Sequence, residues 1–154
     1  MAARPADKSK RRSPPKRPTP KPRVAPSPPQ RDPVTEADIH LVPIKGAADR
    51  GGGPGGEAWR IDVNGKRAGV IFINQIDEPP VGRHASIQIY LNKPSQGRHI
   101  GRVAYRKAAE ASEYDVIYAH MRKSNVASRR AAEEAGFLED DRPGHPQLLM
   151  VRRR

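Results

Sequence analysis

The sequence predicts a mixed α/β domain that follows a basic, proline-rich N-terminal segment. Three observations favour this fold class: apolar residues alternate in several short runs, they recur with helical spacing in two later segments, and the composition changes after residue 34. The chain has 154 residues, the length of about one domain. Because it has no cysteine, a disulfide scaffold and a thiolate metal site are both excluded.

The N-terminal segment differs from the rest of the chain in charge and in proline content. Residues 1–34 hold ten Lys or Arg, two Asp and ten of the 17 prolines, so they carry +8 of the net charge of +12. Little in this segment can be buried, so we expect a disordered basic tail over residues 1–37 and a folded domain over residues 38–154. The tail is either an arm for weak, non-specific contact with nucleic acid through residues 1–34, or a solubilising extension.

The first half of the domain predicts four strands. In chain order, they are expected at residues 38–44, 59–63, 67–74 and 84–91. Asn64 and Gly65 tolerate the positive φ of a tight turn, so they predict a hairpin between the second and third strands. Residues 46–58 are too rich in glycine for a helix and predict a flexible loop.

The second half predicts two helices and three further strands. Helical spacing of apolar residues begins at Ile100 and ends at Ala111. A strand at 115–121 precedes a second helix over 124–137, which Ser124 or Asn125 can cap and Gly136 can end. Short strands at 136–140 and 147–153 close the order β-β-β-β-α-β-α-β-β.

The stretch before the first helix, "QGRHIGR" at residues 96–102, combines glycines with cationic side chains. The first N–H groups of a helix have no intrahelical partner and carry partial positive charge, so they suit an anion such as pyrophosphate. Gly97 and Gly101 would permit a close approach, and Arg98, His99 and Arg102 would add donors. Taken alone, the same residues also fit an ordinary basic helix start.

The stretch resembles the acyl-CoA loop of the GNAT superfamily of N-acetyltransferases, Q/R-x-x-G-x-G/A. Gln96 and Gly101 match its first and last positions, while His99 replaces its middle glycine. A histidine there is expected to need a negative φ. The later segment "SNVASRRAAEEAGF" resembles another helix of the family. Its matching residues are Asn125, Ser128, Gly136 and Phe137.

The resemblance covers roughly residues 38–154 and implies a mostly antiparallel sheet, flanked by helices and splayed between its fourth and fifth strands. It also implies transfer of an acetyl group from acetyl-CoA, as cosubstrate, to a primary amine. The implied cofactor-binding residues are Ile89, Tyr90, Leu91, Gln96, Gly97, Arg98, His99, Ile100, Gly101, Arg102 and Asn125. A backbone N–H near Leu91 would polarise the thioester carbonyl.

The catalytic side chains are expected at two positions. His84 opens the fourth strand and is the candidate base, with Asp77 and Glu78 as weaker alternatives. Many members of the family carry a tyrosine as general acid where this chain has Ala132, so Ser128 or water would take that role. His40, His120 and His145 lie far apart in the sequence without ligand spacing, so no metal site is expected.

The sequence is compatible with several alternatives. The family usually has two helices where this chain has only its glycine-rich loop, so the acceptor pocket is either open or completed by a partner subunit. The alternative function is that of a low-activity or non-catalytic CoA-binding module of the same fold, tethered to nucleic acid or a ribosome by the tail. No apolar run approaches the roughly 18 residues that span a bilayer, so we expect a cytoplasmic protein without a membrane partner. The acceptor could be a protein N-terminus, a lysine, a polyamine or an amine antibiotic.

Overall fold

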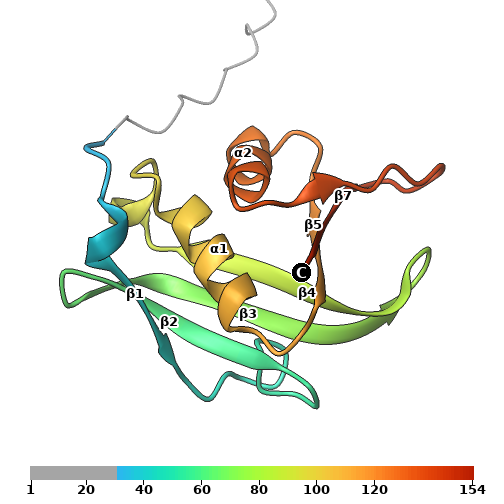
Figure 1. The fold of residues 1–154 in the computed structure, drawn as a ribbon, viewed down its shortest axis with the longest axis horizontal. Coiled ribbons are helices and arrows are strands. Elements are labelled where there is room, and N and C mark those ends of the chain that lie inside the picture. The colour runs from blue at the N-terminus through green and yellow to red at the C-terminus, as the bar shows by residue number, and fades with distance from the viewer. Residues whose placement is uncertain (1–30) are drawn as a thin grey trace, which may run out of the picture.

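A computed structural model describes residues 31–154, which form a seven-stranded sheet with two helices on one face (Figure 1). The strands are β1 (Ile39–Pro43), β2 (Glu57–Val63), β3 (Lys66–Glu78), β4 (Gly82–Leu91), β5 (Val116–Met121), β6 (Leu138–Glu139) and β7 (Leu148–Arg153). The helices are α1 (Ile100–Ala111) and α2 (Val126–Glu134), with short 3₁₀ turns at Glu36–Asp38 and Lys93–Ser95. The predicted order of strands and helices is confirmed.

The first four strands form an antiparallel meander joined by tight turns. Asn64 and Gly65 have φ values of 50° and 76°, so they form the predicted turn between β2 and β3. The second hairpin is longer than expected. The third and fourth strands were expected to end at residue 74 and begin at residue 84, but Glu78 pairs with Gly82, so only residues 79–81 lie between them.

The sheet opens between β4 and β5, as the family resemblance implied. In the described part of the chain these parallel strands pair at two positions, Ala85 with Ile117 and Ser86 with Tyr118. β5 then pairs along its whole length with β7, so its further residues stay in the other half of the sheet. The sheet order is β1-β2-β3-β4-β5-β7-β6, and α1 supplies the crossover that two parallel strands require. The residues of β4 and β5 beyond Ser86 and Tyr118 therefore line a gap, called the β4–β5 gap below.

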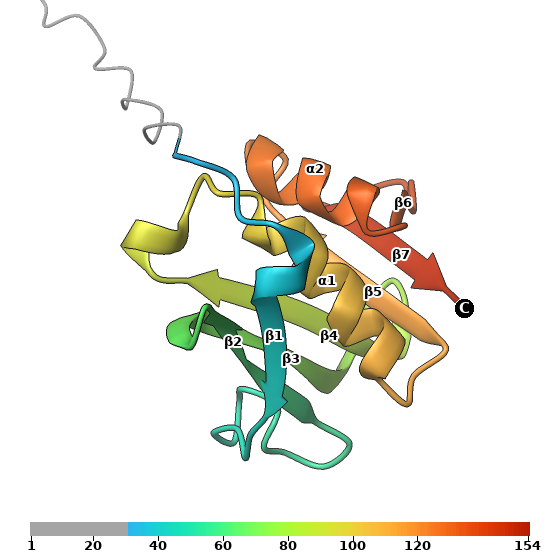
Figure 2. The ribbon, with the colours of Figure 1, turned by 60° about the vertical axis from the view of Figure 1, so that its left-hand side comes forward.

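The hydrophobic core lies between the sheet and the helices. Ile71, Ile73 and Ile87 of the sheet pack in one cluster with Ile100 and Ala104 of α1. α2 joins the same cluster through Ala132, Ala135 and Phe137, and Figure 2 shows it beside α1 on the same side of the sheet. Each large side chain buried here contributes about 1.5–3 kcal/mol, so this face of the sheet fixes the position of both helices.

The packed part of the chain begins earlier than the expected boundary between residues 37 and 38. Val34 is 7% exposed and belongs to the core cluster, and its N–H donates to the carbonyl of Arg98 at 3.1 Å. Residues 31–37 therefore contact the domain. The rest of the expected tail, residues 1–30, lies outside the described residues.

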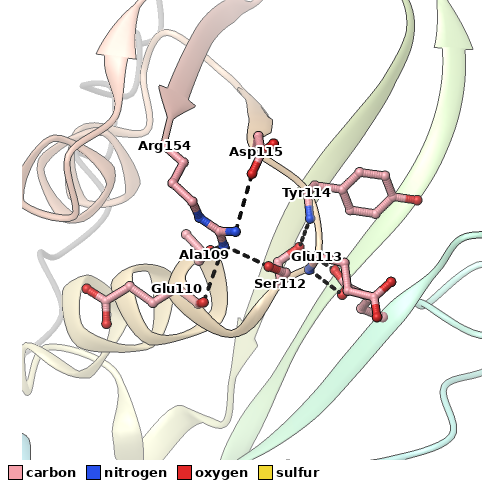
Figure 3. A network of polar contacts seen from close by, with 8 residues as sticks. Ala109, Glu110, Ser112, Glu113, Tyr114, Asp115 and Arg154 are labelled. Atoms are coloured by element: carbon pink, nitrogen blue, oxygen red, sulfur yellow. Dashed lines mark hydrogen bonds and ion pairs between the residues drawn. The ribbon is translucent and has the colours of Figure 1, made fainter.

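A network of polar contacts holds the C-terminal end of α1 (Figure 3). The guanidinium of Arg154 donates to the carbonyls of Ser112 at 2.8 Å and Ala109 at 3.3 Å, and lies 3.3 Å from the carboxylate of Asp115. A cation at this end of a helix satisfies carbonyls that lack intrahelical partners. The network fixes the exit from α1, and with it the start of β5.

Candidate functional site

The β4 side of the gap presents alternate backbone groups. The N–H of Asn92 donates to the carbonyl of Ala68 in β3 at 2.8 Å, and in an antiparallel ladder the hydrogen-bonding direction alternates from residue to residue. Ile89 and Leu91 therefore direct their N–H and C=O groups toward the gap. The carbonyl of Leu91 accepts from the side-chain amide of Gln96 at 3.2 Å, which agrees with this direction.

Tyr90 differs from its two neighbours. Its backbone is directed toward β3, where it pairs with Val70, and its ring lies on the sheet face away from the helices. The ring is 52% exposed and stacks on Phe72 at 6.0 Å between centroids. Of the three β4 residues predicted to bind cofactor, Ile89 and Leu91 thus offer backbone groups to the gap, and Tyr90 does not.

The N-terminus of α1 lies at the end of the loop that leaves β4. Among the described residues no side chain caps this helix, and its first turn contains no acidic residue. The N–H groups of Ile100, Gly101 and Arg102 consequently have no intrahelical partner and lie at the positive end of the helix dipole. Such a terminus can accept an anion.

His99, the N-cap residue of α1, has φ 61° and ψ 20°. The expected negative φ was wrong. Gly97, two residues earlier, has φ 73°, so the chain turns from the Lys93–Ser95 turn into α1 through two left-handed residues. Histidine is among the non-glycine residues that adopt this conformation, at a cost of about 1–2 kcal/mol.

The N-terminus of α2, in contrast, is capped by its own side chain. The Oδ1 atom of Asn125 accepts the N–H of Ser128 at 3.2 Å, as expected for one of the two predicted caps. This bond leaves the Nδ2 group of Asn125 as a donor. Ala132 is 0% exposed in the core and offers no proton, while Ser128 is partly buried in the first turn of α2.

The N-terminal segment supports the loop that precedes α1. Arg31 donates to the carbonyls of Lys93 and Gln96, the latter at 3.3 Å. Arg98 in turn donates to the carbonyl of Asp32 at 3.2 Å, next to the Val34–Arg98 bond. Several loop carbonyls are therefore satisfied from outside the gap. The sequence gives little indication of this support, apart from a valine at the end of a proline-rich segment.

A hollow of about 670 Å³ lies beside the first turns of α1, outside the β4–β5 gap. Its walls are the N-terminal segment, α1 and the end of α2, and they include the ion pair of Arg102 with Glu134 at 3.2 Å. Of the predicted cofactor-binding residues, Arg102 lines it. Because both ion-pair partners are substantially exposed, the pair contributes little to stability.

The predicted base, His84, lies on the face of the sheet opposite the helices and is 7% exposed. Its Nδ1 atom is 2.6 Å from the carbonyl of Gly82, and its Nε2 atom is 2.8 Å from Nε2 of His120. The rings of Tyr118 and His84 are 5.1 Å apart, as are those of His84 and His120, and the His145 ring lies 5.9 Å from that of His120. Three histidines that are distant in sequence thus lie together.

Electrostatics favours the neutral form of His120. Burial lowers its pKa, as do the nearby His84 and His145, while Glu78 acts in the opposite direction. Residues 31–154 contain no cluster of His, Asp or Glu suited to a metal ion. Ser128 lies on α2, across the sheet from His84, so the structure does not bring the two predicted catalytic residues into contact.

The glycine-rich loop between β1 and β2 covers part of the sheet face opposite the helices. Its residue Gly51 donates to Oδ1 of Asn74 at 2.8 Å, and Nδ2 of Asn74 donates back to the carbonyl of Asp49 at 2.6 Å. A Cβ atom at Gly52 would lie 2.1 Å from the carbonyl oxygen of Gly46, so the close packing of the loop requires glycine there. The guanidinium of Arg50 lies 5.0 Å from the centre of the Tyr90 ring. The expected flexible loop instead has defined contacts, because its glycines allow the backbone to fold closely on itself.

A family model for the acetyltransferase (GNAT) family matches residues 24–137. The chain belongs to this family. The match includes the loop before α1, the β4–β5 gap and α2, and it begins within the expected tail. A search of curated protein sequences finds no match.

Solved structures of GNAT proteins share the fold of this GNAT domain. A spermidine N-acetyltransferase chimera from Vibrio cholerae and hSSAT has a TM-score of 0.54 at 21% identity, over 66% of this chain and 68% of that one. The aminoglycoside acetyltransferase AAC(6')-Ib, in complex with coenzyme A and kanamycin, has a TM-score of 0.56 at 20% identity, over 70% of each chain. A putative GNAT-family acetyltransferase from Bordetella pertussis has a TM-score of 0.52 at 21% identity, over 65% and 67%. Within residues 31–154, no helix of the GNAT domain is long and apolar enough to cross a membrane.

Proposed function

We propose that this GNAT domain transfers the acetyl group of acetyl-CoA to a primary amine. The observation that carries the proposal is the continuity of two features: the β4–β5 gap leads along Ile89 and Leu91 to the uncapped N-terminus of α1. A long substrate with amides at one end and phosphates at the other suits this arrangement. Amides can pair with strand backbone groups, and phosphates with the first N–H groups of a helix.

The residues of the gap and of the α1 terminus fit acetyl-CoA chemically. The backbone groups of Ile89 and Leu91 would pair with the amides of the pantetheine arm, and the N–H groups of residues 98–102 would hold the pyrophosphate. Nδ2 of Asn125, which its capping bond leaves free, would donate to the same arm. The His99 ring would lie at the rim, since the backbone of that residue forms part of the loop.

The reaction requires an amine without its extra proton, a polarised thioester carbonyl and a route for the leaving thiolate. A gap-facing N–H of β4 near Leu91 would stabilise the oxyanion, a contribution of about 3 kcal/mol in comparable sites. His84, the base expected from the sequence, has its side chain on the sheet face that α1 and α2 leave uncovered, where the amine would have to be deprotonated. Ser128 or water would protonate the thiolate from the helix side, because Ala132 cannot.

The acceptor is proposed only as a primary amine. Spermidine and kanamycin appear in the names of proteins with the same fold, so a polyamine and an aminoglycoside are reasonable first substrates to test. The glycine-rich loop stands where the family usually has two helices, and Arg50 on this loop puts a positive charge beside Tyr90. That charge would repel a polycation approaching this part of the face.

Two measurements test the proposal in sequence. Acetyl-CoA at about 100 times its dissociation constant should stabilise the native state by about 2.7 kcal/mol and raise the melting temperature. Release of free thiol would then be followed with spermidine, kanamycin, a lysine peptide and a peptide with a free N-terminus. No rise in melting temperature would refute the proposal. A rise without thiol release from any amine would favour the alternative of a non-catalytic CoA-binding module tethered by its basic tail.

A further inference from the structure

The two imidazoles of His84 and His120 form a directly bonded pair across β4 and β5. Their Nε2 atoms are 2.8 Å apart. His120 lies two residues beyond Tyr118, the last residue of β5 that pairs with β4, and therefore stands on the β5 wall of the gap. His84 lies deeper, next to the Tyr118 ring and 7% exposed.

The contact between His84 and Gly82 determines where protons reside in this pair. A carbonyl oxygen only accepts, so Nδ1 of His84, 2.6 Å from the Gly82 oxygen, carries a hydrogen in every protonation state. In neutral His84 the Nε2 atom then has a lone pair. That lone pair accepts the Nε2–H of His120, and a neutral His120 keeps its free lone pair on Nδ1. The basic atom that remains available to a substrate is thus Nδ1 of His120.

Uptake of one proton rearranges both rings in a balanced way. A new N–H bond forms at Nδ1 of His120 as the N–H bond of the acceptor amine breaks and the amine loses that proton. The N–H bond at Nε2 of His120 breaks, and its proton forms a new bond to Nε2 of His84. His120 ends neutral in its other tautomer, and the positive charge resides on His84, whose two N–H groups face Gly82 and His120.

The groups around the pair favour one added proton at most. Two cationic rings would turn two N–H groups toward each other across 2.8 Å. The other ionisable groups nearby are Glu78 at the end of β3, Tyr118 on β5, and His145 in the loop before β7. Arg142 of that loop donates to the carbonyl of Pro80 at 3.3 Å and pairs with Asp140 at 3.1 Å, so its charge is already balanced. Burial and the two neighbouring histidines lower the pKa of His120, which favours the neutral, proton-accepting form of its ring.

We propose that the base of this enzyme is the His84–His120 pair, with Nδ1 of His120 as the atom that receives the proton from the amine or from a water bound to it. In this arrangement His120 is the catalytic residue, and His84 is a positioning residue that fixes the tautomer and holds the charge. The inference rests on the proposed function, because it assigns a role within the same reaction.

Kinetics of acetyl transfer at several pH values test the role of His120. His120→Gln and His84→Gln should each lower kcat/KM by about 100-fold or more, the typical contribution of a general base, and remove the rise of activity with pH. Both variants should bind acetyl-CoA as tightly as the native protein, measured by calorimetry. His40→Gln, at an exposed histidine on β1 of the same sheet, is the matched control and should keep the native rate and pH profile.

Nitrogen NMR of the imidazole rings tests the pair without an acceptor. At high pH, His84 should be the Nδ1–H tautomer and His120 the Nε2–H tautomer. Acidification should add a proton at Nδ1 of His120 and transfer its Nε2 proton to His84. If the native protein is active and His120→Gln keeps the full rate and pH profile, the inference is wrong and His84 is the sole base. An Nδ1–H tautomer of His120 at neutral pH would overturn it as well. A native protein without turnover on any amine would instead refute the proposed function, and with it the role of the pair as a base.

Discussion

The backbone N–H of Val34 donates to the carbonyl of Arg98 at 3.1 Å and joins the N-terminal segment to the loop before α1. The side chain of Val34 is buried in the main core, and Arg31 and Asp32 add contacts to the same loop. Residues 31–34 thus support the loop that forms the proposed pyrophosphate site. Their removal should affect both the stability of the domain and the affinity for acetyl-CoA.

Two truncations separate the contribution of residues 31–34 from that of residues 1–30. Deletion of residues 1–30 should leave the melting temperature and acetyl-CoA affinity nearly unchanged. Deletion of residues 1–34 should cost roughly 2 kcal/mol of stability, from one buried valine and its hydrogen bond, and should weaken binding. Thermal unfolding and calorimetry on both proteins measure these effects. If the two truncated proteins had equal melting temperatures and equal affinities for acetyl-CoA, the Val34 contacts would not support the loop.

Substitutions at Gly101 test the proposed anion site. A Cβ atom at this position would lie 3.6 Å from the Cβ of Ala131, an ordinary contact, so Gly101→Ala should fold normally. Gly101→Glu would place a carboxylate at the helix terminus that is meant for phosphates, and is expected to abolish measurable acetyl-CoA binding. Gly101→Gln has a nearly identical volume and no charge, so it should bind better than Gly101→Glu. Calorimetry that gives equal affinities for Glu and Gln would contradict the proposed position of the pyrophosphate.

The left-handed backbone of His99 leads to an unusual expectation for a loop substitution. His99→Gly should relieve strain of about 1–2 kcal/mol, partly offset by the larger entropy of glycine in the unfolded chain. The melting temperature should therefore stay the same or rise slightly, and acetyl-CoA binding should persist or tighten with little pH dependence. His99→Ala retains the strain and serves as the control. If affinity fell in His99→Gly at pH 5.5 but not at pH 7.5, the ring would be a phosphate donor and not a group at the rim.

The elements that the sequence predicted correctly are those with a local physical cause. The alternation around Trp59 and Ile61, the Asn64–Gly65 turn and the helical spacing after Ile100 each depend on residues close together in the chain. The cap formed by Asn125 is equally local. The gap between β4 and β5 came from family resemblance, since local patterns do not specify strand pairing.

The features that the sequence did not predict depend on contacts between distant residues. Val34 meets Arg98 across 64 positions, and its proline-rich surroundings gave no periodicity to indicate burial. His84 and His120 are separated by a crossover helix, so their contact depends on the pairing of β4 with β5, which local sequence patterns do not specify. The left-handed conformation of His99 follows from the turn that the loop makes into α1, which residue type alone does not reveal.

The lowered pKa of His120 links the stability of the domain to pH. Burial is the main cause of the lowering, so the native state binds fewer protons than the unfolded state between the lowered value and the ordinary histidine value of about 6.5. Stability should accordingly rise with pH across this window and be lost as the pH falls below about 6.5. Urea unfolding at pH 7.5, 6.5 and 5.5 should show this loss in the native protein and in His40→Gln. In His120→Gln the loss should be smaller, because the group that takes up the proton on unfolding is absent. An equally steep loss in His120→Gln would mean that other groups, such as paired carboxylates, govern the acid sensitivity of the domain.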